Sequence, residues 1–157
     1  MSATPDLCHL SASQLLEGYA RRAFSPVEVT RAVLDHMAKL EPTLHAFLVI
    51  DEDGALRAAR AAEATWLQAG EKPALCGVPV SVKDTIEMAG MPTTYGSLAF
   101  RHNVCEDAEI VRRLRAAGAV ILGKTNTPEF ALSPRTENRL GPPTSKDRKS
   151  TRLNSSH

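Results

Sequence analysis

Apolar residues recur at helical spacing along the first seventy positions of the chain. The clearest case is the segment SPVEVTRAVLDHMAKLEP, whose apolar stripe consists of Val29, Val33, Met37 and Leu40. Ser25 is a typical helix cap, Glu28 completes a capping box, and Pro26 follows the cap where a missing N–H costs nothing. Because a proline interrupts a helix, we predict that this helix ends at Pro42.

Two more helices are predicted on either side of this one. Ser11 can cap a helix, and Gln14 completes a capping box three residues later. The alanine-rich stretch from Asp53 to Ala69 has the composition of a third helix, which Gly70 would end. The chain therefore begins with a helical N-terminal arm.

Three short apolar runs predict strands, at residues 44–50, 78–82 and 119–122. The last run, AVIL, is continuous and is typical of a strand that is buried on both faces. A helix that opens near residue 106 and stops at Gly118 separates the second strand from the third. A strand, a helix and a strand with a short return favour parallel pairing. The predicted fold class is α/β.

Composition and charge exclude several classes of function. The 157 residues suffice for one domain, and the net charge of +1 does not indicate nucleic acid or an anionic membrane as a partner. No apolar run approaches the roughly 20 residues of a membrane span. The first residues have no basic start and no long apolar stretch, so we expect no secretion signal. Three widely spaced cysteines, Cys8, Cys76 and Cys105, fit a reducing compartment, so we expect a cytoplasmic protein. No metal-ligand spacing occurs, and we expect no metal and no cofactor.

The last residues differ from the rest of the chain. Residues 147–157, DRKSTRLNSSH, resemble the in-frame translation of a common sequencing-library adapter, and a natural basic tail is the alternative. Either way they cannot bury enough apolar surface to order themselves. We expect one domain portion over residues 1–146 and a disordered tail, artefactual in origin, over 147–157.

A phosphate-binding pattern, G-x-x-x-x-G-K-[ST], matches residues 118–125 letter for letter. The chemistry of that pattern needs a flexible loop between a strand and a helix. Here the residues between the glycines are the apolar run itself. We therefore interpret Lys124 as a strand-end residue and expect no nucleotide site.

Lys83 closes the apolar run of GVPVSVKDTIEMAG and precedes a glycine-rich loop. One interpretation is an ordinary charge at the end of a strand. The other is a lysine held away from water, because desolvation favours the neutral amine that can act as a base. Asp84 would oppose this if it faced the amine, but adjacent residues of a strand point to opposite faces. The residues alone leave both interpretations open.

Two linked segments resemble the amidase signature enzymes. GVPVSVKDTIEMAGMPTTYGS is similar to the N-terminal signature of that family, and DAEIVRRLRAAGAVILGKTNTPEFAL is similar to the segment that follows. The resemblance covers roughly residues 10–140. It implies the N-terminal part of the amidase signature fold, incomplete here: a helical arm, then a mixed sheet whose parallel strands are flanked by helices.

The resemblance also implies a chemistry, hydrolysis or transfer of a small carboxylic amide through a Ser–cis-Ser–Lys triad without metal or cofactor. Lys83 matches the catalytic lysine. The family places its two serines in glycine- and serine-rich segments that this chain lacks, so we expect the chain as given to be inactive.

Two alternatives stay open. Within the family, an amidotransferase A-type subunit would need partner subunits and glutamine. Outside it, the chain would be a non-catalytic binding or assembly protein. A homo-oligomer is compatible with either, and the sequence does not define the oligomeric state.

Overall fold

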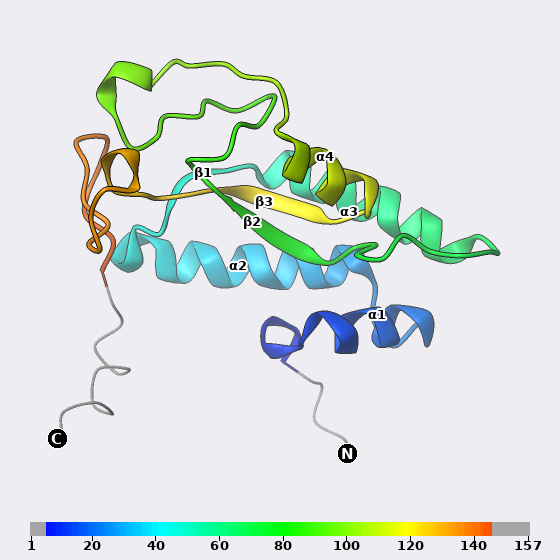
Figure 1. Ribbon diagram of the computed structural model, residues 1–157. Helices are drawn as coiled ribbons and strands as arrows, with labels where there is room; N and C mark the ends of the chain where they lie inside the picture. The colour runs from blue at the N-terminus through cyan, green and yellow to red at the C-terminus, as the bar shows by residue number, and fades with distance from the viewer. Residues whose placement is uncertain (1–5, 146–157) are drawn as a thin grey trace, which may run out of the picture.

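A three-stranded sheet organises residues 6–145, the part of the chain that the computed structural model describes (Figure 1). The strands are β1 (Phe47–Ile50), β2 (Pro79–Lys83) and β3 (Val120–Thr125). β3 lies in the middle, parallel to β2 and antiparallel to β1. The predicted parallel pair is confirmed, and the sheet as a whole is mixed. The predicted tail, residues 147–157, lies outside the described residues.

Four α-helices accompany the sheet, with short 3-10 turns at Leu7–His9, Leu98–Phe100 and Glu129–Ala131. They are α1 (Ala12–Ala20), α2 (Pro26–Leu44), α3 (Glu52–Leu67) and α4 (Glu109–Ala116). In Figure 1, α4 lies on one side of the strands, and the long α2 runs along the other. Each predicted helix is present, and the α/β class is confirmed. Within residues 6–145, no helix combines the length and the apolar character that crossing a membrane requires.

Both predicted capping boxes form. Ser11 accepts a hydrogen bond from the Gln14 N–H at 3.3 Å, and the Gln14 side chain accepts one from the Ser11 N–H at 2.8 Å. Ser25 and Glu28 repeat the arrangement at the start of α2, with distances of 3.2 and 2.7 Å. These bonds satisfy N–H groups that a helix start otherwise leaves without partners.

The predicted end of α2 at Pro42 is wrong. The helix continues to Leu44 and ends at His45, which adopts a left-handed conformation with φ of 50° and donates its N–H to the Glu41 carbonyl at 2.9 Å. Pro42 removes one helical hydrogen bond in the last turn. A contact from outside the helix holds that turn instead. The Phe47 N–H donates a hydrogen bond to the Glu41 side chain at 2.9 Å.

Two core clusters pack against β3, one on each face, and a third joins α1 to α2. Val120 and Leu122 pack with α2 and α3, where the small, fully buried Ala55 and Ala59 allow close approach. Ile121 points to the other face, into a second cluster with Val82, Met88, Met91 and Val111. The strand is therefore buried on both faces, as the continuous apolar run predicts.

At Gly123, the central strand β3 lies close against the backbone of β1. The φ of this glycine is 150°, and a Cβ there would lie 2.1 Å from the Val49 carbonyl oxygen. We expect Gly123→Ala to lower the free energy of unfolding by about 3 kcal/mol, because it adds backbone strain and a clash in the central strand. Denaturant unfolding of the purified chain measures this. Gly141→Ala is the matched control, since nothing lies within 4 Å of a Cβ at that position. Equal stabilities for the two variants would contradict the prediction.

Candidate functional site

Lys83 is the last residue of β2, and its backbone is held on both sides. It pairs with Thr125 of β3, and its carbonyl accepts the Ile86 N–H at 2.9 Å in the turn that follows. The next residue, Asp84, donates its N–H to the Thr125 carbonyl at 3.1 Å. Lys83 thus has a fixed backbone at the carboxyl end of a parallel strand pair.

The side chain of Lys83 is exposed, and it belongs to the face of the sheet that α2 covers. Val82 is buried in the cluster beneath α4, so its neighbours Ser81 and Lys83 point the other way. Ser81 lines a hollow on that side with Val33 and Met37. Among residues 6–145, no side chain or carbonyl forms a hydrogen bond or ion pair with the Lys83 ammonium. The described residues therefore leave this amine open to solvent.

A second lysine, Lys124, is the buried one. Its side chain is 0% exposed and lies 3.2 Å from the carboxylate of Asp84, which is 1% exposed. Burial lowers the pKa of Lys124, and the nearby Asp84 carboxylate opposes that shift. The interpretation of Lys124 as a plain strand-end residue is incomplete, because this penultimate residue of β3 lies inside the protein. The phosphate-loop pattern lies on β3, as expected, and its lysine is already paired.

The engagement of Asp84 with Lys124 agrees with the expectation that Asp84 and Lys83 point to opposite faces. Sequence reasoning did not single out this pair. The available signal was a lysine placed directly after the continuous apolar run AVILG, combined with an acid directly after the other strand. A charge in such a position is buried only when it is paired.

The loop after β2 folds back over the ends of the strands. Tyr95 donates its N–H to the Asp84 carbonyl at 3.1 Å and accepts the Phe130 N–H at 2.7 Å. The rings of Tyr95, Phe100 and Phe130 meet with centroid separations of 5.5 to 6.3 Å. The Tyr95 hydroxyl donates to Glu87 at 2.8 Å, and that bond raises the pKa of Tyr95 to about 12. The loop is therefore tied to both strand ends.

Within residues 6–145, no serine hydroxyl forms a hydrogen bond with the Lys83 amine. Ser97 is buried at the start of the turn Leu98–Phe100, and Ser133 accepts the Arg135 N–H at 3.1 Å. No group of three His, Cys, Asp or Glu side chains within residues 6–145 is arranged to hold a metal ion. What the site can offer by itself is one amine on a rigid strand end.

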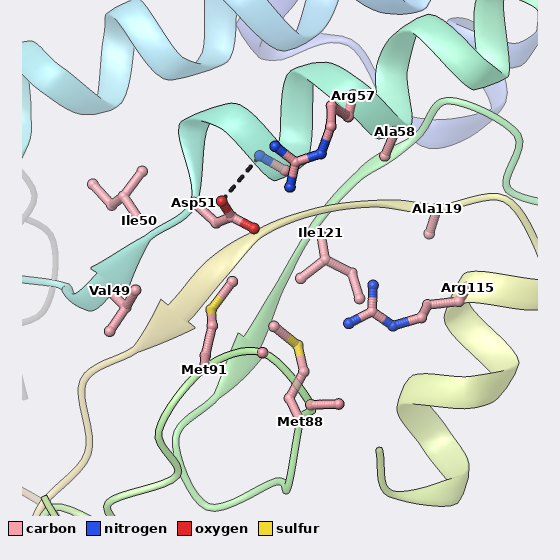
Figure 2. A pocket seen from close by; sticks show the side chains of 13 residues that line it. Val49, Ile50, Asp51, Arg57, Ala58, Met88, Met91, Arg115, Ala119 and Ile121 are labelled. Carbon is pink, nitrogen blue, oxygen red and sulfur yellow. Dashed lines mark hydrogen bonds between the residues drawn. The ribbon is translucent and has the colours of Figure 1, made fainter. Parts of the chain in front are cut away.

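A hollow of about 500 Å³ lies elsewhere, on the α4 side of the sheet (Figure 2). Its lining includes Met88, Met91 and Ile121, and Figure 2 shows Arg57 and Arg115 on opposite sides of it. Arg115 forms an ion pair with Asp107, whose carboxylate lies 2.8 Å from the Arg115 Nε. Lys83 does not line this hollow, so the candidate base and this cavity are separate features.

Comparisons with known proteins place the chain in a family. Residues 28–154 match the family described as Amidase. The A-type subunit of the glutamyl-tRNA(Gln) amidotransferase of Acidothermus cellulolyticus is 48% identical over 141 residues, which are 88% of this chain and 28% of that protein. The solved structure of the peptide amidase from Stenotrophomonas maltophilia superposes with a TM-score of 0.72 at 34% identity, over 78% of this chain and 26% of the other. The chain belongs to the amidase signature family.

The fold likeness extends to a more distant enzyme. A fatty acid amide hydrolase gives a TM-score of 0.79 at 22% identity, over 88% of this chain and 25% of that one, which shows the shared fold alone. The chain thus spans a little over a quarter of the length of the curated relatives that it matches, such as 28% of the amidotransferase protein from Acidothermus cellulolyticus.

The two lysines differ in accessibility, and amine acylation can test this. With an acylating reagent at mildly alkaline pH, we expect Lys83 to react as fast as the exposed Lys39. Lys124 should react at least about 10³-fold more slowly, because the reagent reaches it only after local or global opening. Peptide mass spectrometry over a time course gives the three rates. Equal rates for Lys124 and Lys39 would contradict the burial of the ion pair.

Proposed function

We propose that this chain forms the N-terminal part of an enzyme that hydrolyses or transfers small carboxylic amides, with Lys83 as its base. The observation that carries the proposal is an unengaged amine on a fixed strand end, beside a carboxylate that a different lysine occupies. The family membership supports the same reaction class. Because the chain covers 28% of the relative in Acidothermus cellulolyticus, the activity is proposed for the longer protein.

The proposed chemistry follows the triad that the family resemblance implies. A serine hydroxyl is a weak nucleophile until a base takes its proton. The neutral amine of Lys83 would remove that proton through a bridging serine, and the alkoxide would attack the amide carbonyl. The tetrahedral intermediate would then expel the amine, which takes up a proton, and leave an acyl-enzyme. Water or another acceptor would release the acyl group.

The solvation of Lys83 bears directly on this role. A lysine works as a base when its surroundings disfavour the ammonium. Residues 6–145 leave its amine exposed, on the face of the sheet that α2 covers. In the proposed enzyme, the part of the protein that carries the serines would also cover this face and desolvate the amine.

Lys83→Ala in the full-length enzyme should lower kcat by about 10³-fold or more, because the nucleophile loses its base. The thermal unfolding midpoint should stay close to that of the parent, since the side chain has no partner in the described residues. Steady-state kinetics on an aryl amide, with calorimetry alongside, measures both. Lys39→Ala is the matched control, an exposed lysine on α2. Near-normal turnover in Lys83→Ala would remove this lysine from the mechanism.

The 157-residue chain itself should not turn over an aryl amide, because a base without a nucleophile cannot form an acyl-enzyme. The comparison is product release by the chain and by its Lys83→Ala variant at equal concentration. We expect identical background rates. Turnover by the chain that disappears in the variant would show that the chain holds a nucleophile of its own.

A second candidate function is supported by one observation, the 48% identity to the A-type subunit of an amidotransferase. In that case the longer protein would release ammonia from glutamine and would depend on partner subunits. Ammonia release from glutamine and from a simple amide, measured on the full-length protein alone, separates the two functions. Robust hydrolysis of the simple amide without a partner favours the free amidase.

A further inference from the structure

The ammonium of Lys124 is enclosed by oxygen atoms from the loop that begins directly after Lys83. Its Nζ donates to the Ile86 carbonyl at 2.8 Å and to Thr93 Oγ1 at 2.8 Å. The third oxygen is Asp84 Oδ1 at 3.2 Å, an ion pair rather than a well-aligned hydrogen bond. Three oxygens match the three N–H groups of an ammonium. The Lys124 ammonium thus contacts three residues of one loop.

Asp84 is fixed through all of its polar groups. Its Oδ2 accepts from the Thr94 N–H at 3.1 Å and from the Thr94 hydroxyl. Its own N–H donates to the Thr125 carbonyl at 3.1 Å, and its carbonyl accepts from the Tyr95 N–H at 3.1 Å. Within residues 6–145, Lys124 is the one polar contact of Oδ1. Because Asp84 is bonded directly to Lys83, whatever fixes Asp84 also fixes the start of the Lys83 side chain.

Stability alone does not explain a buried ion pair. Removing two charges from water is costly, and an apolar pair of similar volume often gives equal or higher stability. Desolvation is the largest influence on Lys124 and lowers its pKa, while Asp84, Cys105 and Glu87 act in the opposite direction. What the pair provides beyond stability is a single geometry, since charge and direction both have to match.

We propose that Lys124 and Asp84 are positioning residues for the base: they hold the end of β2 and the loop after it, so that the amine of Lys83 meets its serine partner at hydrogen-bonding distance. The inference rests on the proposed function. Proton transfer demands such a distance, and a misplacement of about 1 Å can cost about 10²-fold in rate. The pair itself does not touch the reacting atoms.

The test uses the full-length enzyme with the double variant Asp84→Asn/Lys124→Met. The variant removes both charges together, and the asparagine carbonyl can still accept the Thr94 N–H. We expect the thermal unfolding midpoint to stay within a few degrees of the parent. We also expect kcat to fall by about 10- to 100-fold with KM changed by less than about threefold. A purely structural pair would leave kcat unchanged in a variant of equal stability, and that result would overturn the proposal.

A second variant covers the case in which the double variant does not fold. Thr94→Val removes the hydroxyl bond to Asp84 and keeps both charges and the Thr94 N–H. We expect kcat to fall by about 3- to 10-fold, and Thr65→Val, an exposed change on α3, should leave it unaltered. An unaltered kcat in Thr94→Val would count against the proposal as firmly as one in the double variant.

Lys83→Ala, measured in parallel, separates this inference from the proposed function. If Lys83→Ala abolishes turnover while the pair variants keep a normal kcat, the positioning role is wrong and the proposed base stands. Normal turnover in Lys83→Ala would overturn both. If the pair acts through Lys83, its loss should reduce the residual rate of Lys83→Ala much less than it reduces the parent rate, because effects through one group are not additive.

Discussion

The described part of the molecule depends on one strand, β3, which is the only strand of the sheet with a partner on both sides. It pairs parallel with β2 and antiparallel with β1. Its alternate side chains enter the two core clusters that flank it, Val120 and Leu122 on one face and Ile121 on the other. A fully apolar run is needed for this, because neither face offers water to a polar side chain. Gly123 then lets β1 approach, and Lys124 follows at once.

This strand also determines where chemistry can occur. β2 and β3 run parallel, so their carboxyl ends lie at the same edge of the sheet, and a lysine stands near each end. The segments after both strands meet there through the hydrogen bond from Phe130 to Tyr95. Loops at the ends of parallel strands are common places for functional side chains, because the rigid sheet fixes the point from which each loop starts.

Much of this arrangement could be predicted from the sequence, for reasons that are local. The capping boxes at Ser11 and Ser25 are formed by residues three positions apart, and the strand–helix–strand order dictates the parallel pair. The end of α2 could not be predicted in the same way. Pro42 is a strong local stop, but contacts of Glu41 with the segment beyond the helix outweigh it.

The environment of the two lysines could not be predicted from the residues next to them in the sequence. Burial of Lys124 results from a loop 31 to 40 residues earlier in the chain, which brings Ile86, Thr93 and Asp84 around the ammonium. Val82 of β2 is buried in a core cluster, so its neighbour Lys83 points to the opposite face, where its side chain is exposed. The pattern of apolar and polar residues in the sequence locates both strand ends. It does not show which of the two lysines has hydrogen-bonding partners in the fold.

The two lysines differ in burial and in hydrogen-bonding partners, and this difference is the main physical feature of the site. The same chemical group stands near two neighbouring strand ends, and the protein surrounds one of them with three oxygens, one of which belongs to a carboxylate. That arrangement engages Asp84, the acid next to the candidate base, on the face of the strand opposite the Lys83 side chain. A carboxylate directly after the proposed base is compatible with base chemistry, because it points to the other face and is paired there with Lys124. The proposed positioning role follows from the same geometry: Asp84 is bonded directly to Lys83, so an acid that is fixed on one face also fixes the backbone from which the base extends on the other.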